Sequence, residues 1–173
     1  MQIGYLGHAG FVVETEGAVV VADPWVSRHG AFDSSWMQLP QNHHLAPLVR
    51  EKLEDPRKER FVYVSHEHED HFDRDFLASI ARRDFTAVVP RFRRTEMVER
   101  LRATGCAVIA CADGETVPIP GGYLRLFVQD GGLNRDSGLL VKADGRTFLD
   151  LNDTVRKIED DPEPKVVALD TAS

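Results

Sequence analysis

The chain has 173 residues, of which 42% are hydrophobic and 28% are charged, and its formal net charge is −7. That length is enough for one domain whose core needs no disulfide bonds, and the composition excludes a disordered or fibrous chain. The acidic balance argues against a nucleic-acid partner, and no apolar run is long enough to span a bilayer.

The first part of the chain is predicted to form antiparallel β-structure. Residues 2–6, 11–15 and 18–22 are short runs rich in valine, isoleucine and aromatic residues, and the last two are separated by a tight reversal. A long polar and aromatic loop is expected over residues 23–45. A first helix then follows over residues 46–55 and is closed by a proline.

The pattern changes in the middle of the chain. Strands are predicted at residues 61–65, 86–89 and 107–110, and the first has few polar interruptions, as expected when both faces of a sheet are covered. Helices are predicted between them, from Asp73 to about residue 83 and from Thr95 to residue 103. This β-α-β-α-β series predicts parallel strands joined by right-handed crossovers.

The last part of the chain returns to antiparallel signals. Residues 123–129, 137–143 and 146–151 alternate in polarity, and Asp144-Gly145 supplies a hairpin turn between the last two. A final short strand is predicted at residues 165–169. The elements together predict a mixed α/β domain with meander and crossover parts.

Cysteine usage bears on the compartment. Cys106 and Cys111 are five positions apart in a strand-like run, which directs their side chains to opposite faces and argues against a disulfide bond. Scattered thiols suit a reducing compartment, and residues 1–5 lack the basic and apolar segments of a secretory leader. We therefore expect a cytoplasmic protein.

The residues that carry chemistry cluster directly after the strand at 61–65. His66 and His68 are two apart, so in extended backbone both imidazoles project to the same side, and Asp70 and His71 follow where the chain leaves the strand. Ligand sites of open α/β sheets gather at this carboxyl edge. The alternative, a solvated acidic turn, requires three of the seven histidines to cluster there by chance. Imidazole with carboxylate favours zinc, iron or manganese.

These residues resemble a known family. Residues 65–71 match the HxHxDH signature of the metallo-β-lactamase superfamily at every defined position. Residues 6–11 and 22–25 are similar to the GHA and DP elements of its UlaG-like branch. Within that branch, residues 30–36 and 151–153 resemble the β-lactamase-like domain of CMP-N-acetylneuraminate hydroxylases.

The resemblance implies an αββα metallo-β-lactamase-like fold, with residues 1–173 forming a single domain that lacks the C-terminal part of the full fold. It also implies a set of metal ligands, most simply for two zinc ions, with iron or manganese as the alternative. Asp23 would hydrogen-bond to the ligands and orient them. The alternative is that Asp23 only begins a turn before Pro24. The chain has no histidine after His71, and Asp130 lies nearest to where the family places its next one. The expected ligands are His66 and His68 for one metal, Asp70 and His71 for the second, Asp153 as the bridging carboxylate, and Asp130 as a substitute ligand.

Other residues are expected to act on the substrate. The resemblance implies that His8 and Asp70 take part in catalysis, whereas the plain interpretation of His8 is a turn residue satisfied by backbone. Trp36 is a candidate wall for the substrate, and the alternative is that it covers the core. Arg91 and Arg93 follow the strand at 86–89, on the same sheet edge as the metal loop, where they would hold a phosphate or carboxylate unless they are simply solvated.

The leading hypothesis from these patterns is a metal-dependent hydrolase that uses a metal-activated water on an ester-like, amide or phosphodiester bond of a small, anionic substrate. One alternative is an iron-dependent redox enzyme related to CMP-sialate hydroxylase, and another is a non-catalytic binding domain of the same fold. An apolar sheet face is expected to remain open, so we also expect a homodimer or partner chain in contact near residues 137–170.

Overall fold

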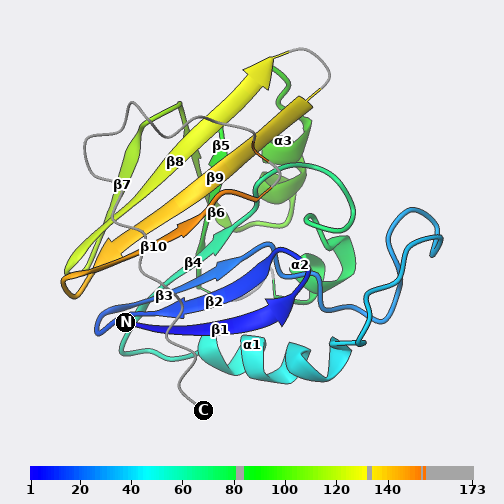
Figure 1. The fold of residues 1–173 in the computed structure, drawn as a ribbon, viewed down its shortest axis with the longest axis horizontal. Coiled ribbons are helices and arrows are strands. Elements are labelled where there is room, and N and C mark those ends of the chain that lie inside the picture. Colours follow the sequence, from blue (N-terminus) through cyan, green and yellow to red (C-terminus); the bar gives the residue numbers. More distant parts are fainter. Residues whose placement is uncertain (81–83, 132–133, 153, 155–173) are drawn as a thin grey trace.

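Six strands form the larger sheet of the protein, whose computed structural model describes residues 1–80, 84–131, 134–152 and 154. The strands lie in sequence order across the sheet (Figure 1). The first three pair antiparallel, and the third begins a parallel run that continues to the sixth. The prediction of parallel central strands is therefore confirmed. The strands are β1 (Gln2–Gly7), β2 (Gly10–Glu14), β3 (Ala18–Ala22), β4 (Glu59–Tyr63), β5 (Thr86–Pro90) and β6 (Ala107–Cys111).

A second, antiparallel sheet of four strands follows in the order β10-β9-β8-β7. Asp144 and Gly145 both have positive φ, 54° and 70°, which is the backbone of the hairpin turn predicted there. The sequence does not predict the first strand of this sheet, β7, because a four-residue run that contains Pro118 carries little strand signal. The predicted strand at 165–169 lies outside the described residues. The strands are β7 (Thr116–Ile119), β8 (Gly122–Gly131), β9 (Asn134–Ala143) and β10 (Arg146–Asp150).

Three α-helices and one short 3-10 helix complete the described elements. The helix after the long loop ends three residues before the predicted position. After Leu53 the chain tightens, because the N–H groups of Glu54 and Asp55 donate to carbonyls only three residues back. The second helix is described to Ile80, and its predicted last turn, 81–83, lies outside the described residues. The helices are η1 (His43–Leu45), α1 (Ala46–Lys52), α2 (Arg74–Ile80) and α3 (Glu96–Ala103).

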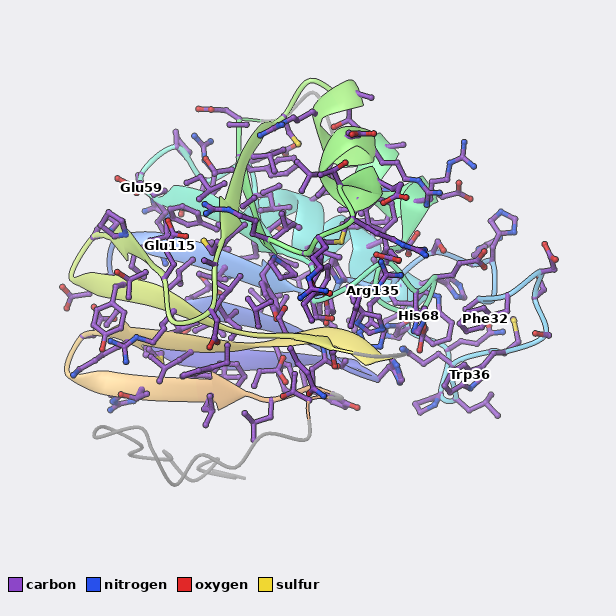
Figure 2. The ribbon with its side chains drawn as sticks, turned by 90° about the horizontal axis from the view of Figure 1, so that it is seen from above. Phe32, Trp36, Glu59, His68, Glu115 and Arg135 are labelled. Carbon is purple, nitrogen blue, oxygen red and sulfur yellow. The ribbon has the colours of Figure 1, made fainter. Side chains whose placement is uncertain are left out.

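The elements stack in three layers, with the six-stranded sheet in the middle (Figure 2). Alternate side chains of its central strands pack against the three α-helices, as Val19 and Val62 do, while Val20 and Tyr63 pack against the antiparallel sheet. Every residue of β3 is buried as a consequence. Cys106 and Cys111 contact opposite clusters, as predicted, and both are free thiols.

This layering covers both faces of the larger sheet. The sequence predicts an open apolar sheet face that another chain would cover. In the structure, the chain's own antiparallel sheet covers this face, through Leu124, Leu126, Leu139 and Val141. The architecture is mixed α/β with two packed sheets and flanking helices, as in metallo-β-lactamase-like folds. Among the described helices, none is both long and apolar enough to cross a membrane.

Candidate metal centre

The loop that connects β4 to α2 carries the histidine-rich motif, and buried aspartates hold it in place. One carboxylate oxygen of Asp23, at the end of β3, accepts the N–H of Ser65 at 2.8 Å. Asp73 caps α2 by accepting the N–H of Phe76 at 2.9 Å, as predicted. Its other oxygen accepts the N–H groups of Val26 and Ser27 at 2.9 and 2.7 Å, which ties the neighbouring loop to the same helix.

His66 and His68 point their ring nitrogens at each other. Nε2 of His66 and Nδ1 of His68 are 2.8 Å apart, and their ring centroids are separated by 4.5 Å. His66 is buried, whereas His68 is exposed at the surface of the loop. The spacing therefore does bring both imidazoles to the same side of the chain, with one ring nitrogen of each directed at a common point.

A second group of ligand atoms lies beside the first. His8, Asp70 and His71 each offer one atom, and these atoms all lie within 4.8 Å of one another. Oδ2 of Asp70 is 2.9 Å from Nε2 of His8 and 3.5 Å from Nε2 of His71. The rings of His66 and His71 are 4.2 Å apart between centroids, so the two groups form one continuous centre.

The chemistry of this donor set fits a divalent metal. Oδ1 of Asp70 is buried and has no hydrogen-bond partner among the described residues, which would be costly for a carboxylate without a cation nearby. Imidazole nitrogens with carboxylate oxygens suit zinc, iron or manganese. His8 joins this group because the turn between β1 and β2 holds it at a φ of 48°. Its flanking glycines were the only sequence signal for that turn.

Behind the ligands, Asp23 contacts His71 from the core. Its Oδ2 lies 3.0 Å from Nδ1 of His71 and also accepts a hydrogen bond from the side-chain amide of Asn152. Beneath the loop, the hydroxyl of Ser137 donates to the carbonyl of Ser65 at 2.9 Å, and the hydroxyl of Tyr63 donates to the Ser137 carbonyl at 2.7 Å. These contacts connect the metal loop to both sheets.

Asp150, at the end of β10, is a further buried acid near this network. Burial, and next the negative charge of Asp23, raises the pKa of Asp150 to about 7. Burial, and next the same aspartate, also raises the pKa of Tyr63 well above its ordinary value. Oδ2 of Asp150 has no hydrogen-bond partner in the described part of the chain. No local pattern in the sequence distinguished Asp150 from an ordinary strand residue.

Other predicted site residues have partners outside this group of ligand atoms. Asp130 accepts the backbone N–H of Arg93 at 2.7 Å, and a different carboxylate of the same sheet, Asp136, lies 3.1 Å from Nδ1 of His66. Arg91 donates to the carbonyl of Ala110 and pairs with Glu115. Figure 2 shows Glu115 and His68 toward opposite sides of the molecule. The predicted bridging ligand, Asp153, lies outside the described residues.

An exposed aromatic surface borders the centre. Trp36 is 49% exposed, so it does not cover the core, whereas Trp25 is buried. The Trp36 ring lies 5.6 Å from His8 and stacks on Phe32 at 6.0 Å, and the Phe32 ring is 6.2 Å from His68. Figure 2 shows Phe32 and Trp36 on a loop that projects beside His68.

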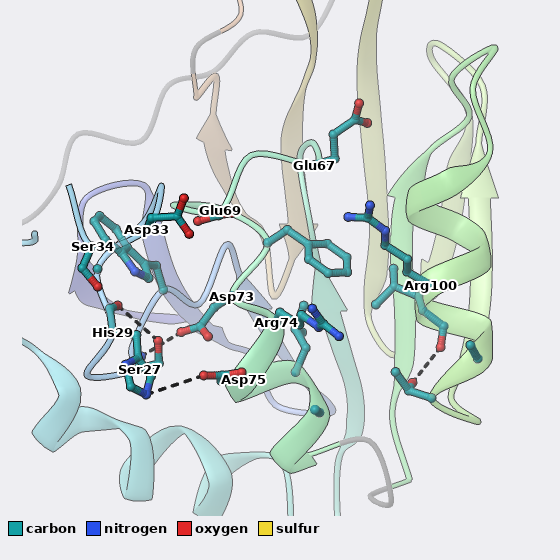
Figure 3. Close-up of a pocket in the computed structure, with 18 residues that line it drawn as sticks. Ser27, His29, Asp33, Ser34, Glu67, Glu69, Asp73, Arg74, Asp75 and Arg100 are labelled. Atoms are coloured by element: carbon teal, nitrogen blue, oxygen red, sulfur yellow. Dashed lines mark hydrogen bonds and ion pairs between the residues drawn. The ribbon is translucent and has the colours of Figure 1, made fainter. Parts of the chain in front are cut away.

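A separate groove of about 860 Å³ lies on the helix side of the metal loop (Figure 3). The metal loop contributes Glu67 and Glu69 to its wall, and the helices contribute Arg74 and Arg100. The described lining contains none of the metal-loop histidines, His66, His68 and His71, so the groove adjoins the metal centre without including it.

Comparison with known families agrees with this geometry. The family model described as the beta-lactamase superfamily domain matches residues 2–131. The chain therefore belongs to the beta-lactamase superfamily, and its fold is the metallo-β-lactamase fold.

Individual relatives are larger proteins. A curated protein of Mycolicibacterium smegmatis, named as a Rieske 2Fe-2S iron–sulfur protein, is 31% identical over 162 residues, which is 88% of this chain and 30% of the relative. A Mycobacterium tuberculosis protein with the same kind of name is 34% identical over 84 residues, 49% of this chain and 15% of the relative. The chain thus spans less than a third of the length of these relatives.

Solved structures share the fold at low identity. CmlA, a diiron beta-hydroxylase from Streptomyces venezuelae, has a TM-score of 0.64 and 20% identity, with 91% of this chain and 30% of that chain covered. A structure described as a possible metal-dependent hydrolase from Veillonella parvula has a TM-score of 0.64 and 18% identity, with 90% and 64% covered. An isothiocyanate hydrolase from Delia radicum gut bacteria has a TM-score of 0.60 and 16% identity, with 91% and 64% covered.

Proposed function

We propose that this chain carries the metal centre of a metal-dependent hydrolase. The observation that supports this most directly is the convergence of His8, Asp70 and His71 beside the apposed nitrogens of His66 and His68. Within the superfamily, the sequence elements at residues 6–11 and 22–25 favour the UlaG-like branch. Zinc is the metal we propose first, since it accepts this donor set and needs no redox partner.

The resemblance of residues 65–71 to the superfamily signature assigns the ligands. His66 and His68 would hold one metal, and Asp70 and His71 would hold a second one. A metal held there would lower the pKa of a water molecule and so supply a nucleophile at neutral pH. No serine or cysteine nucleophile is then required.

The chain's own residues would complete the reaction. The side chain of His8 is 26% exposed and its Nε2 lies 2.9 Å from Asp70, so His8 would be a third ligand of the second metal, on the side open to substrate. Asp70 is buried and would act as the proton acceptor for the attacking water. Trp36 and Phe32 would pack against an apolar part of the substrate and exclude water from the reacting bond.

Hydrolysis of simple chromogenic esters and phosphodiesters by the zinc-loaded protein tests this proposal. Replacing Asp70 with asparagine should reduce the rate at least 100-fold, because the substitution removes a charged ligand and a proton acceptor together. Asp75→Asn is the matched control, because Asp75 is exposed and five residues away. Equal rates in both variants, or no hydrolysis of any of these substrates by the parent, would count against a hydrolase.

An iron-dependent redox enzyme is the second candidate, and one observation favours it. The curated relatives are named as Rieske 2Fe-2S proteins, and CmlA, which shares the fold, is a diiron hydroxylase. Cys106 and Cys111 contact opposite faces of the sheet and cannot ligate one iron–sulfur cluster together. Electrons would therefore come from another domain or protein.

The metal itself separates the two candidates. Protein purified without chelators and without added metal should contain zinc or manganese if it is a hydrolase. Iron with a visible absorption band, bleached by dithionite, would favour the redox enzyme. A protein that binds neither metal would instead be a non-catalytic member of the superfamily.

A further inference from the structure

The first residues of β9 run along the metal loop in the reverse direction. Arg135 donates to Glu67 at 2.6 Å, Asp136 lies 3.1 Å from His66, and Ser137 donates to the carbonyl of Ser65 at 2.9 Å. Three successive residues of the antiparallel sheet thus contact three successive residues of the loop. Figure 2 shows Arg135 and His68 on the same side of the molecule, and the Arg135–Glu67 contact places this end of β9 at the metal loop.

The middle contact favours one tautomer of His66. Nδ1 of His66 lies 3.1 Å from Oδ1 of Asp136 and 3.0 Å from the hydroxyl of Ser65. A hydroxyl can donate or accept a hydrogen bond, but an ionised carboxylate can only accept one. The tautomer that suits both neighbours therefore has its proton on Nδ1. Nε2, which faces His68, is then the nitrogen with the free lone pair.

The other half of the centre is built in the same way. Asp23 lies 3.0 Å from Nδ1 of His71, whose Nε2 faces Asp70. Both supporting carboxylates are buried, and they come from opposite sheets. A carboxylate behind a ligating histidine fixes its tautomer and ring orientation and raises its basicity. Each group of ligand atoms thus has one carboxylate behind one histidine.

We propose that Asp136 is the positioning residue for His66, holding its proton on Nδ1 so that Nε2 is free to bind metal. This inference rests on the proposed metal centre. It gives a role to a residue that the sequence did not single out and that follows the predicted substitute ligand, Asp130, by six positions. The role is indirect, since Asp136 reaches the metal through the imidazole.

The two aspartates of the same sheet provide a matched experiment. Asp136→Asn keeps the shape of the side chain and removes its charge, and we expect zinc affinity to fall 10- to 100-fold in competition with a chromophoric chelator. Asp130→Asn removes a carboxylate that contacts the Arg93 backbone, and its zinc affinity should match the parent. Equal affinity in all three proteins, or an equal loss in both variants, would overturn the proposal.

A second measurement needs neither a variant nor bound metal. Long-range ¹H–¹⁵N NMR of the metal-free parent, with His66 assigned through its loss in His66→Gln, reports which ring nitrogen is protonated. The proposal requires the proton on Nδ1 of His66, and a proton on Nε2 would overturn it even if Asp136→Asn does not fold. Because this readout is independent of zinc, a protein that binds no metal would refute the proposed function without deciding the tautomer.

Discussion

At the scale of single residues, the two tryptophans report on the metal centre from different environments. Trp36 is 49% exposed and Trp25 is 5% exposed, yet both rings lie within 5.6 Å of the His8 ring. A paramagnetic ion bound by His8, Asp70 and His71 would therefore lie close to both indoles. Their fluorescence is a direct measure of occupancy.

We expect cobalt(II) to quench tryptophan emission saturably. In Trp25→Phe, which retains only the exposed indole, the emission maximum should lie at longer wavelength and the quenching should persist. His8→Ala should weaken the saturable quenching at least tenfold in apparent affinity, because the ion loses a ligand. Identical titrations with and without His8 would remove it from the metal centre.

The raised pKa of Asp150 should make the stability of the metal-free protein depend on pH. Its folded-state pKa of about 7 lies above the unfolded value of about 4, because burial and then Asp23 disfavour the charged form. The folded state therefore binds more protons between these values, and stability falls as pH rises from 4 to 7. The contribution is about a few kcal/mol, at roughly 1.4 kcal/mol per pKa unit.

Urea unfolding in the presence of EDTA, repeated from pH 4.5 to 7.5, measures this effect. Asp150→Asn should flatten the decline, because the amide does not titrate. An unfolding free energy that rises across this range by the same amount in the parent and in Asp150→Asn would show that Asp150 is ionised in the folded protein.

At the scale of elements, Asp73 joins the long loop to α2. It accepts three backbone N–H groups, from Phe76 in the helix and from Val26 and Ser27 in the loop. Removing the carboxylate would leave buried donors without partners, at a cost of about 1–3 kcal/mol. The aromatic surface and the metal loop share this anchor, so the same change should loosen both.

Asp73→Ala should lower the unfolding free energy by about 2–3 kcal/mol in urea titrations. Asp75→Ala in the same helical turn is the control, because Asp75 is 66% exposed and only 3.8 Å from an exposed His29. The control should stay within about 0.5 kcal/mol of the parent. Comparable losses in the two variants would mean that the anchor contributes little.

The elements also show how far the sequence could predict this fold and site. The parallel strands and the loop histidines follow from local patterns, because strand period and ligand spacing act within a few residues. Asp136 and Asp150 come from β9 and β10 and reach the loop only through packing of the two sheets. The short β7 and the position of Arg91 against Glu115 also depend on that packing.

At the scale of the whole molecule, the described chain covers both faces of its larger sheet and leaves β10 as an edge of the smaller one. An exposed edge strand can pair with another chain. The expected contact near residues 137–170 therefore rests on this edge, and we propose that it pairs with a second copy.

Light scattering at 1 and 50 micromolar would test the edge. A dimer that dissociates on dilution, and is weakened by Thr147→Pro in the edge strand, is the expected result; Thr147 lies within β10, opposite Lys142 of β9. A monomer at both concentrations would leave β10 without a partner copy.

Metal content, measured by mass spectrometry after purification without chelators, shows whether His66 and His68 hold metal. The parent should carry one to two equivalents of zinc, manganese or iron, and the double variant His66→Ala with His68→Ala should lose at least one while keeping the parent's circular dichroism. His43→Ala with His44→Ala, an adjacent pair on η1, should keep the full content. Equal metal content in the two double variants would show that His66 and His68 do not hold metal.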